Sequence, residues 1–426
     1  MSTFSNPRTI SCHIIHLIVQ KKDSLMRLDT HLNNYSLSKQ NRRLVYIICY
    51  GVLRHFFYLS HIFELYAQGK SKAKVRVLGI IGLYQIIFMH KPLYATINET
   101  VNACNELKCL NAKSFINGLL RHLSKDNLSP VKNFQELPDW LYGKLKKHYP
   151  TKLDDIVKCS NIKGPIFLRL NQQKDQATFL KMLKQKDICY HKTDTPNCIS
   201  LNQPQNIITL PLFAEGFFSV QDQSAQLAAH ILEPMHGDKI LDACAAPGGK
   251  STHLLELCPE IELTIMDSNT KRFERIKENL ARLKLNDLNI KLAIHDATKD
   301  LNPKLKFDKI LIDAPCSSTG VIRRNPDIKV LRTPKDVKEI IEIQKHILEN
   351  LAQYIKPKGL LLYSTCSILP EENEKQIKQF IKNHPQFKAV KIPMLEPSLK
   401  QQYGYQIFPT INGGDGFYYC LLQALK

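Results

Sequence analysis

The chain has 426 residues, which is long for a single core, and its 43% hydrophobic and 23% charged residues are typical of a globular protein. Lys and Arg total 59 against 39 Asp and Glu, and this net charge of +20 favours a polyanionic partner over a generically basic protein. Residues 1–150 hold 21 basic and 8 acidic residues. Most of the excess therefore lies in the N-terminal third, as expected for an appended nucleic-acid-binding domain.

The sequence also argues against four other classes of protein. The twelve cysteines include no C-x-x-C pair, which argues against a zinc ribbon or a disulfide framework. No apolar run approaches the roughly 20 residues that a membrane span needs, and the first residues lack the order of a secretion signal. We expect a cytoplasmic monomer with no metal and no membrane partner.

The first predicted domain is helical. Between residues 10 and 148 the apolar positions recur with the period of α-helices, as at Ile14, Ile15 and Ile18. Residues 1–148 are therefore predicted to form an all-α domain. Two basic runs within it are either phosphate-binding faces or simply solvated ones: Arg42-Arg43, and Lys70, Lys72, Lys74 and Arg76.

Residues 149–236 are predicted to form a small mixed α/β linker domain. Its expected strands are Ile166–Leu168, Ile207–Leu210 and Gly216–Val220, and its expected helices are Ala177–Lys186 and Ser224–Leu232.

From residue 237 to 426 strands and helices alternate, which predicts a Rossmann-like, doubly wound α/β sheet. The expected strands are Lys239–Ala243, Glu262–Met266, Ile290–Ile294, Lys309–Ile312 and Leu360–Tyr363, and the expected helices include Lys271–Leu283 and Val337–Tyr354. A late strand, Gly416–Gln423, is expected to pair antiparallel at the edge of the sheet. In such sheets the ligand lies at the carboxyl ends of the strands.

A glycine-containing loop follows the first of these strands. It runs Cys244-Ala245-Ala246-Pro247-Gly248-Gly249-Lys250, and a helix is expected to begin near Ser251. Glycines let the backbone approach a ligand, and the helix offers free N–H groups. Asp267 and Asp296, at the ends of the next two strands, are predicted to meet the ribose hydroxyls and the adenine amino group of an adenosine ligand.

Two rival ligands are considered for this loop. Gly249-Lys250-Ser251 matches the end of a phosphate-binding P-loop and Lys309–Asp313 resembles a Walker B strand, but Cys244 stands where the first P-loop glycine is required. No dinucleotide G-x-G-x-x-G occurs either. An adenosine ligand without a phosphate chain fits better, and an NTPase stays open as the alternative.

Two cysteines follow the fourth and fifth strands. Asp313-Ala314-Pro315-Cys316 ends one strand and Thr365-Cys366 ends the other, so both thiols are expected at one rim of the sheet. A buried cysteine is usually a small hydrophobe, but two at neighbouring strand ends indicate chemistry. A thiolate added to carbon 6 of cytosine makes carbon 5 nucleophilic towards a methyl sulfonium. Asp313 is the candidate acid for nitrogen 3 of the ring.

The segments Cys244–Lys250, Asp313–Cys316 and Thr365–Ser367 resemble the NOL1/NOP2/Sun family of RNA cytosine-C5 methyltransferases. This resemblance implies S-adenosylmethionine as the cofactor, held by Cys244–Lys250, Asp267, Asp296 and Asp313. It also implies that Cys366 is the nucleophile and that Cys316 assists release of the methylated RNA.

The resemblance extends over nearly the whole chain. Ile97–Val101 and Phe115–Arg121 resemble a NusB-like helical domain, a combination typical of the bacterial Sun branch of the family, whose members methylate a cytosine of 16S ribosomal RNA in the small subunit. Arg323 and Arg324 are either phosphate contacts or solvated loop residues. Transfer RNA as the substrate, or a non-catalytic RNA-binding or antitermination factor built on residues 1–150, are the alternatives.

Overall fold

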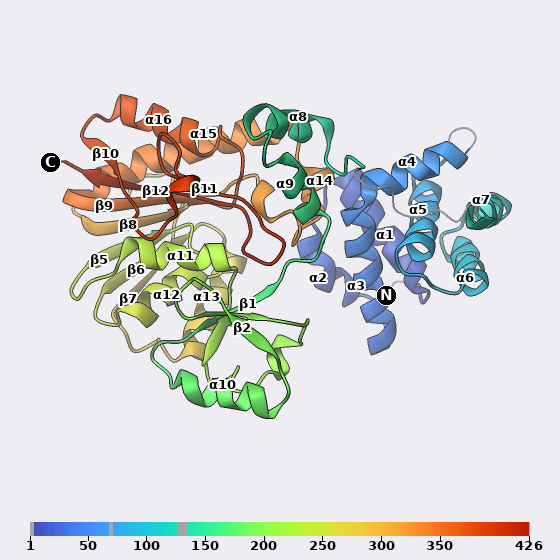
Figure 1. The fold of residues 1–426 in the computed structure, drawn as a ribbon, viewed down its shortest axis with the longest axis horizontal. Helices are drawn as coiled ribbons and strands as arrows, with labels where there is room; N and C mark the ends of the chain where they lie inside the picture. Colours follow the sequence, from blue (N-terminus) through green and yellow to red (C-terminus); the bar gives the residue numbers. More distant parts are fainter. Residues whose placement is uncertain (1–3, 68–70, 126–133, 426) are drawn as a thin grey trace. The chain divides into compact units, whose positions relative to one another are not determined.

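A computed structural model describes residues 4–67, 71–125 and 134–425, and Figure 1 shows their fold. The chain divides into two compact units. The first comprises Met1–Lys163 together with Ile322–Thr333, and the second comprises Gly164–Val321 and Pro334–Lys426. The first unit is therefore discontinuous in sequence, because it includes a short segment that follows the Cys316 loop.

The described part of the first unit is helical, which confirms the expected all-α domain. Its helices are α1 (Pro7–Lys21), α2 (Leu28–Leu32), α3 (Lys39–Arg54), α4 (Phe56–Tyr66), α5 (Ala73–Ile87), α6 (Leu93–Glu106), α7 (Lys113–Lys125), α8 (Asp139–His148), α9 (Leu153–Ser160) and α14 (Ile328–Leu331). Short 3₁₀ turns lie at Leu25–Arg27 and Leu110–Ala112.

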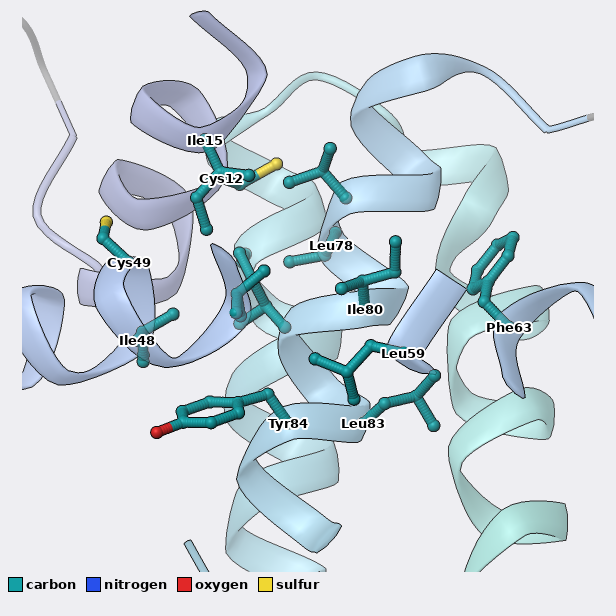
Figure 2. Packing of buried hydrophobic residues seen from close by; sticks show 14 of the residues in the cluster. Cys12, Ile15, Ile48, Cys49, Leu59, Phe63, Leu78, Ile80, Leu83 and Tyr84 are labelled. Atoms are coloured by element: carbon teal, nitrogen blue, oxygen red, sulfur yellow. The ribbon is translucent and has the colours of Figure 1, made fainter. Parts of the chain in front are cut away.

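Helix α5 lies at the centre of this unit and is buried on nearly all sides. Figure 2 shows Leu78, Ile80 and Leu83 of α5 among side chains of α1, α3 and α4. Gly51 of α3 permits the close approach of Tyr84, since a Cβ at Gly51 would lie 1.9 Å from the Tyr84 ring. The apolar faces read from the sequence thus converge on one helix.

Two of the basic residues noted in the sequence are engaged by neighbouring carboxylates. Arg42 pairs with Asp29 at 2.7 Å, and Arg76 pairs with Glu64 at 2.7 Å. Lys70 lies outside the described residues. Among the described helices, none alone is long and apolar enough to cross a membrane, although α3 and α4 together, bent by 81°, satisfy that length and composition.

The second unit begins with a four-stranded antiparallel sheet of order β2-β3-β1-β4. Its elements are β1 (Ile166–Leu170), α10 (Gln176–Gln185), β2 (Tyr190–Lys192), β3 (Cys198–Leu201) and β4 (Phe218–Val220). The strand expected at Ile207–Leu210 is wrong, because Ile207–Thr209 forms a 3₁₀ turn with no buried residue. Prolines at 204 and 211 flank this stretch, and proline lacks the N–H that a central strand must donate.

The large sheet has the order β10-β12-β9-β8-β5-β6-β7, with β11 paired to β12. Its strands are β5 (Lys239–Ala243), β6 (Glu262–Asp267), β7 (Ile290–Ile294), β8 (Phe307–Asp313), β9 (Ile355–Thr365), β10 (Phe387–Val390), β11 (Tyr405–Ile407) and β12 (Phe417–Ala424). Strands β5 to β9 are parallel neighbours, as expected. The strand order reverses between β5 and β8, which is where such sheets bind ligands.

The last strand occupies a different place from the expected one. Strand β12 pairs antiparallel, as predicted, and its partner is β9, but it is not at the edge, because β10 pairs with its other side. Strand β10 has only four residues, so its hydrophobic pattern is too short to predict a strand. Its pairing with β12 joins segments that are distant in sequence.

Helices cover both faces of the large sheet (Figure 1). They are α11 (Gln223–Leu232), α12 (Gly249–Leu257), α13 (Thr270–Leu283), α15 (Pro334–Leu351) and α16 (Glu374–Asn383). The first three pack with one face and the last two with the other. Adjacent strand residues such as Ile240 and Leu241 belong to opposite cores, so the strands are buried on both faces.

Candidate active site

The loop after β5 has the backbone needed to approach a ligand. Cys244 and Gly248 both have positive φ, at 60° and 91°. Helix α12 begins at Gly249, and its N-cap residue, Gly248, has no side chain to satisfy the N–H groups of the first turn. The first turn of α12 therefore begins without a side-chain cap on its N–H groups. Burial raises the pKa of the Cys244 thiol well above its ordinary range, so its backbone is the part suited to binding.

Side chains from neighbouring elements hold this loop in place. Asp267 Oδ2 accepts a hydrogen bond from the Ala246 N–H at 2.9 Å, and Arg272 donates to the Ala246 carbonyl. Asn279 Nδ2 donates to the Pro247 carbonyl at 3.0 Å. With its carbonyls engaged from outside, the loop is organised before any ligand arrives.

Arg169, a residue that the sequence did not single out, anchors the end of the loop. It lies in β1 and is fully buried, and its guanidinium donates to the Gly249 carbonyl at 2.5 Å. It also forms a bidentate pair with Glu256 of α12, at 2.7 and 2.9 Å. Nothing marked this residue in the sequence, because an arginine in a short strand pattern normally points to solvent.

The acidic residues at the strand ends differ in their surroundings. Asp267 ends β6 and is buried, and its second oxygen accepts the Asn269 N–H. Asp296 lies two residues beyond β7 and is exposed, where hydrogen bonds from the N–H and hydroxyl of Thr298 lower its pKa. Both acids follow adjacent strands of the same edge, which is the arrangement predicted for an adenosine ligand.

Asp242 is a further buried acid at this edge. Its Oδ2 accepts the Ser251 hydroxyl at 2.5 Å, and burial raises its pKa to about 7. Ser251 is thus engaged by a carboxylate, and Lys250 pairs with Asp313. The two side chains that a P-loop would use on phosphate and magnesium both contact protein carboxylates, which argues against the NTPase alternative.

Lys250 and Asp313 form a close ion pair, with Nζ 2.5 Å from Oδ2. The ammonium also lies 5.4 Å from the centre of the Phe417 ring, and Asp313 Oδ1 accepts the Ser364 hydroxyl at 3.1 Å. Asp313, the residue predicted to protonate nitrogen 3 of the cytosine, is thus paired with a side chain that carries protons, the ammonium of Lys250. Lys250, predicted as one of the cofactor-binding residues, belongs to the same group.

The two cysteines predicted to lie at one rim of the sheet, Cys316 and Cys366, are in contact. Cys316 Sγ and Cys366 Sγ are 3.3 Å apart, too far for a disulfide and within hydrogen-bonding distance for sulfur. The hydrogen bond from the Cys316 thiol lowers the pKa of Cys366, whereas the same contact raises the pKa of Cys316. This contact therefore favours ionisation of Cys366 over ionisation of Cys316.

The loops that carry the cysteines are joined through their backbones. The Gly320 N–H donates to the Cys366 carbonyl at 2.9 Å, and the Gly416 N–H donates to the Gly320 carbonyl at 3.0 Å. A Cβ at Gly320 would lie 2.1 Å from the Gly416 oxygen, so only glycine fits. Ser318, whose Oγ is 3.6 Å from Cys366 Sγ, has a φ of 61°. Strain of this kind is common at functional loops.

A buried carboxylate lies beneath the cysteines. Glu372 accepts hydrogen bonds from Ser317 and Ser367, the residues that follow Cys316 and Cys366. In the sequence Pro370–Glu374 reads as the start of a helix, and α16 does begin at Glu374. Glu372, however, points into the protein, which a helix-start pattern does not predict.

Two aromatic side chains and one of the two arginines considered as phosphate contacts have structural surroundings. Phe218 and Tyr363 are fully buried and pack in the protein interior. Arg323 is also buried, and its carbonyl accepts a hydrogen bond from Arg54 within the first unit. No group of three or more His, Cys, Asp or Glu side chains suited to a metal is found in the described parts of the chain.

Comparison with known proteins finds matches along most of the chain. Residues 229–423 match the family described as 16S rRNA methyltransferase RsmB/F, residues 5–125 the NusB family, and residues 137–208 the RsmF/B-like ferredoxin-like domain. The chain is 40% identical to the ribosomal RNA small subunit methyltransferase B of Pasteurella multocida, over 98% of this chain and 96% of the relative. It is 37% identical to the protein of that name from Proteus mirabilis, over 99% and 100%.

A solved structure shares the fold. The crystal structure of PH0851 covers 99% of this chain and 100% of its own, with a TM-score of 0.80 at 23% sequence identity. At that identity the likeness shows the fold alone. The match to the NusB family agrees with the helical domain expected from Ile97–Val101 and Phe115–Arg121.

Proposed function

Because the chain belongs to the family of 16S rRNA methyltransferases RsmB/F, we propose that it methylates carbon 5 of a cytosine in 16S ribosomal RNA, with S-adenosylmethionine as methyl donor. The observation that carries the chemistry is the pair of sulfur atoms 3.3 Å apart at the carboxyl ends of β8 and β9. The Lys250–Asp313 ion pair stands at the end of β8, on the same edge.

The residues of the β5 loop fit the proposed donor. The uncapped start of α12 suits the carboxylate of the methionine part, and Asp267 and Asp296 suit the ribose hydroxyls and the adenine amino group. Cys244–Lys250 and Asp313 complete the proposed binding residues. When bound, S-adenosylmethionine supplies a methyl group on a positively charged sulfur, which carbon 5 takes as an electrophile.

We assign the first step to the Cys366 thiolate, which adds to carbon 6 of the cytosine. The π electrons of the C5–C6 double bond shift to the C4–C5 bond, those of the C4–N3 double bond shift to nitrogen 3, and nitrogen 3 takes the proton that Lys250 shares with Asp313. Carbon 5 is thereby made nucleophilic. The attack requires that the cytosine be taken out of the base stack. The free energy of that step is lower in unpaired RNA than in a duplex.

Release is assigned to Cys316. Once Cys366 is bonded to carbon, it no longer competes with Cys316 for the negative charge, and the Cys316 proton leaves to solvent. The Cys316 thiolate then takes the proton from carbon 5, that electron pair re-forms the C5–C6 double bond, and the C6–S bond breaks. Cys366 returns as a thiolate, and nitrogen 3 returns its proton to the Lys250–Asp313 pair.

This assignment is tested with two cysteine variants. We expect Cys366→Ala to abolish methylation, and Cys316→Ala to permit addition but trap a covalent protein–RNA adduct. The adduct is measured as a slowly migrating band on a denaturing gel, with unmodified 16S ribosomal RNA and S-adenosylmethionine.

Cys189→Ala is the matched control, because Cys189 is exposed and belongs to the small sheet domain. It should methylate at the wild-type rate without an adduct. If Cys316→Ala gives no adduct while Cys366→Ala keeps full activity, the assignment of both thiols is wrong.

The identity of the RNA is tested separately. Bisulfite sequencing of ribosomal and transfer RNA from cells that lack the protein should reveal one cytosine in 16S ribosomal RNA that has lost its methyl group. A loss confined to transfer RNA would favour the alternative substrate. A rise in melting temperature with ATP rather than with S-adenosylmethionine would favour the NTPase.

We also propose a cytoplasmic monomer whose helical residues 1–148 contribute RNA binding, followed by a linker domain over 149–236 and a catalytic domain over 237–426. The order of the three family matches supports this division, although the matches begin at residues 137 and 229. The +20 net charge supports an RNA partner.

A further inference from the structure

The carboxylate of Glu372 is buried and accepts an unusually complete set of hydrogen bonds. Its Oε1 accepts the Ser317 N–H at 2.7 Å and Gln344 Nε2 at 3.1 Å. Its Oε2 accepts the hydroxyls of Ser317 and Ser367, both at 2.5 Å. All four of these contacts are made by donors, which is the pattern that an ionised carboxylate satisfies.

These donors tie the two cysteine loops to one group. Ser317 directly follows Cys316, and Ser367 directly follows Cys366. Their hydroxyls are 3.2 Å apart, and Thr319 Oγ1 lies 3.1 Å from each of them. A shift of either loop would therefore break a hydrogen bond to Glu372.

The carboxylate is bonded unequally to the two cysteine loops, because it accepts both the N–H and the hydroxyl of Ser317 but only the hydroxyl of Ser367. Although its chief cause is the contact with Cys366, the rise in the pKa of Cys316 includes a contribution from the charge of Glu372. Among the groups around Cys366, Asp313 raises and Lys250 lowers the pKa of that thiol. Glu372 thus disfavours a thiolate at Cys316, and the ammonium of Lys250 favours one at Cys366.

The remaining groups around Glu372 do not cancel its charge. The Tyr363 hydroxyl donates to the Glu372 backbone carbonyl at 2.8 Å, and Gln344 is neutral. Burial raises the pKa of Glu372, while its hydrogen bonds from Ser317 and Ser367 lower it. With no described ion pair to Lys or Arg, the carboxylate acts on the cysteine loops through these neutral donors.

We propose that Glu372 is a positioning residue that keeps the proton of the cysteine pair on Cys316 and thereby makes Cys366 the nucleophile. This inference rests on the proposed function, because it assigns a cause to the unequal roles of the two thiols. Glu372 itself touches neither sulfur and acts through the serine that follows each cysteine.

The test measures the reactivity of each thiol in the full-length protein, without RNA or methyl donor. Limited alkylation with iodoacetamide, followed by mass spectrometry of the peptides, gives the ratio of the Cys366 rate to the Cys316 rate. In the wild type we expect Cys366 to react faster. In Glu372→Gln we expect the ratio to fall about tenfold, the effect of one pKa unit on the thiolate fraction.

Glu374→Gln is the matched control. Glu374 begins α16, and its carboxylate accepts the backbone N–H of Gln402 rather than bonding to either cysteine loop. The control should keep the wild-type ratio. A ratio unchanged in folded Glu372→Gln, or reduced equally in Glu374→Gln, would overturn the proposal.

A second variant covers the case in which Glu372→Gln does not fold. Ser317→Ala keeps the carboxylate but frees the Cys316 loop from its hydroxyl bond to Glu372, and we expect the ratio to fall about threefold because the N–H of residue 317 still binds the carboxylate. No change in that variant would equally contradict the proposal.

Steady-state methylation separates this inference from the proposed function. Glu372→Gln should lower kcat while leaving KM for RNA near the wild-type value, because the Glu372 side chain is fully buried. An inactive wild type would refute the proposed function and leave the alkylation result standing. Normal wild-type methylation with an unchanged alkylation ratio in Glu372→Gln would refute only the role of Glu372.

Discussion

Lys250 is the residue where two proposed tasks meet. It lies in the first turn of α12, next to the loop proposed for the methyl donor, yet its ammonium is 2.5 Å from Asp313. The loop itself is held by Asp267, Arg272 and Arg169 through its backbone. Removing the ammonium should therefore disturb proton transfer more than donor binding.

We predict that Lys250→Met lowers kcat by roughly 10²–10⁴, the range of a general acid contribution, and weakens the donor by less than about tenfold. Single-turnover methylation and calorimetric titration with S-adenosylmethionine measure the two effects. Lys271→Met, at the exposed start of α13, should change neither. A donor affinity reduced as much as kcat would show that Lys250 only binds the cofactor.

Among the elements, α14 has an unusual buried cation. Lys329 is 1% exposed, and its ammonium donates to the Arg54 carbonyl at 2.9 Å and to Asn161 Oδ1 at 2.6 Å, all within the first unit. Burial lowers its pKa from 10.5 to about 7. The neutral partners satisfy its hydrogens without supplying a counter-charge.

This burial predicts a pH dependence of stability. Between pH 7 and 10.5 the unfolded chain keeps Lys329 protonated while the folded protein holds it neutral, so the unfolded state binds more protons and stability rises with pH. Relative to Lys329→Met, the wild type should gain up to about 1.4 kcal/mol per pH unit in this window.

Urea unfolding at a series of pH values checks the slope, with Lys378→Met of α16 as the exposed control. Equal slopes for the wild type and Lys329→Met would contradict this prediction, because they would show that Lys329 stays protonated in the folded protein over this pH range.

At the scale of the whole molecule, the discontinuous first unit has a consequence for fragments. Val330 and Leu331 pack against its hydrophobic core, and Asp327 accepts hydrogen bonds from the Leu25 N–H at 3.0 Å and the Ser24 hydroxyl at 3.3 Å. The helical residues alone lack this segment. Division of the chain at a single boundary would therefore leave part of the core uncovered.

We predict that a fragment of residues 1–163 unfolds at a lower urea concentration than the same helices in the full chain. A peptide of residues 322–333 added in excess should raise its midpoint, because it binds only the folded form. The same peptide with Asp327→Asn should bind about tenfold more weakly, as a charged acceptor is lost. A fragment that is as stable as the full-length unit would show that the segment is dispensable.

Strands β5 to β9 and their helices could be predicted because their patterns are local. A strand buried on both faces is a short continuous apolar run, and a covering helix has apolar residues at a period of 3.6. Since the carboxyl ends of parallel strands share one edge, the places of Asp267, Asp313, Cys316 and Cys366 followed from the order of the strands.

Contacts between segments that are distant in sequence could not be predicted from these local patterns. The place of β12 between β9 and β10 depends on partners far apart in sequence, and the assignment of Ile322–Thr333 to the helical unit depends on which core its apolar residues meet. Neither choice leaves a periodic pattern to read.

Residue order alone thus settled which chemical groups this protein carries and on which edge of the sheet they stand, because alternation and spacing act over a few residues. Tertiary structure decided how those groups act on one another: the 3.3 Å between two sulfur atoms, the pairing of Lys250 with Asp313, and the inward turn of Glu372. Proton positions depend on distance and burial, and both arise only when distant segments pack together.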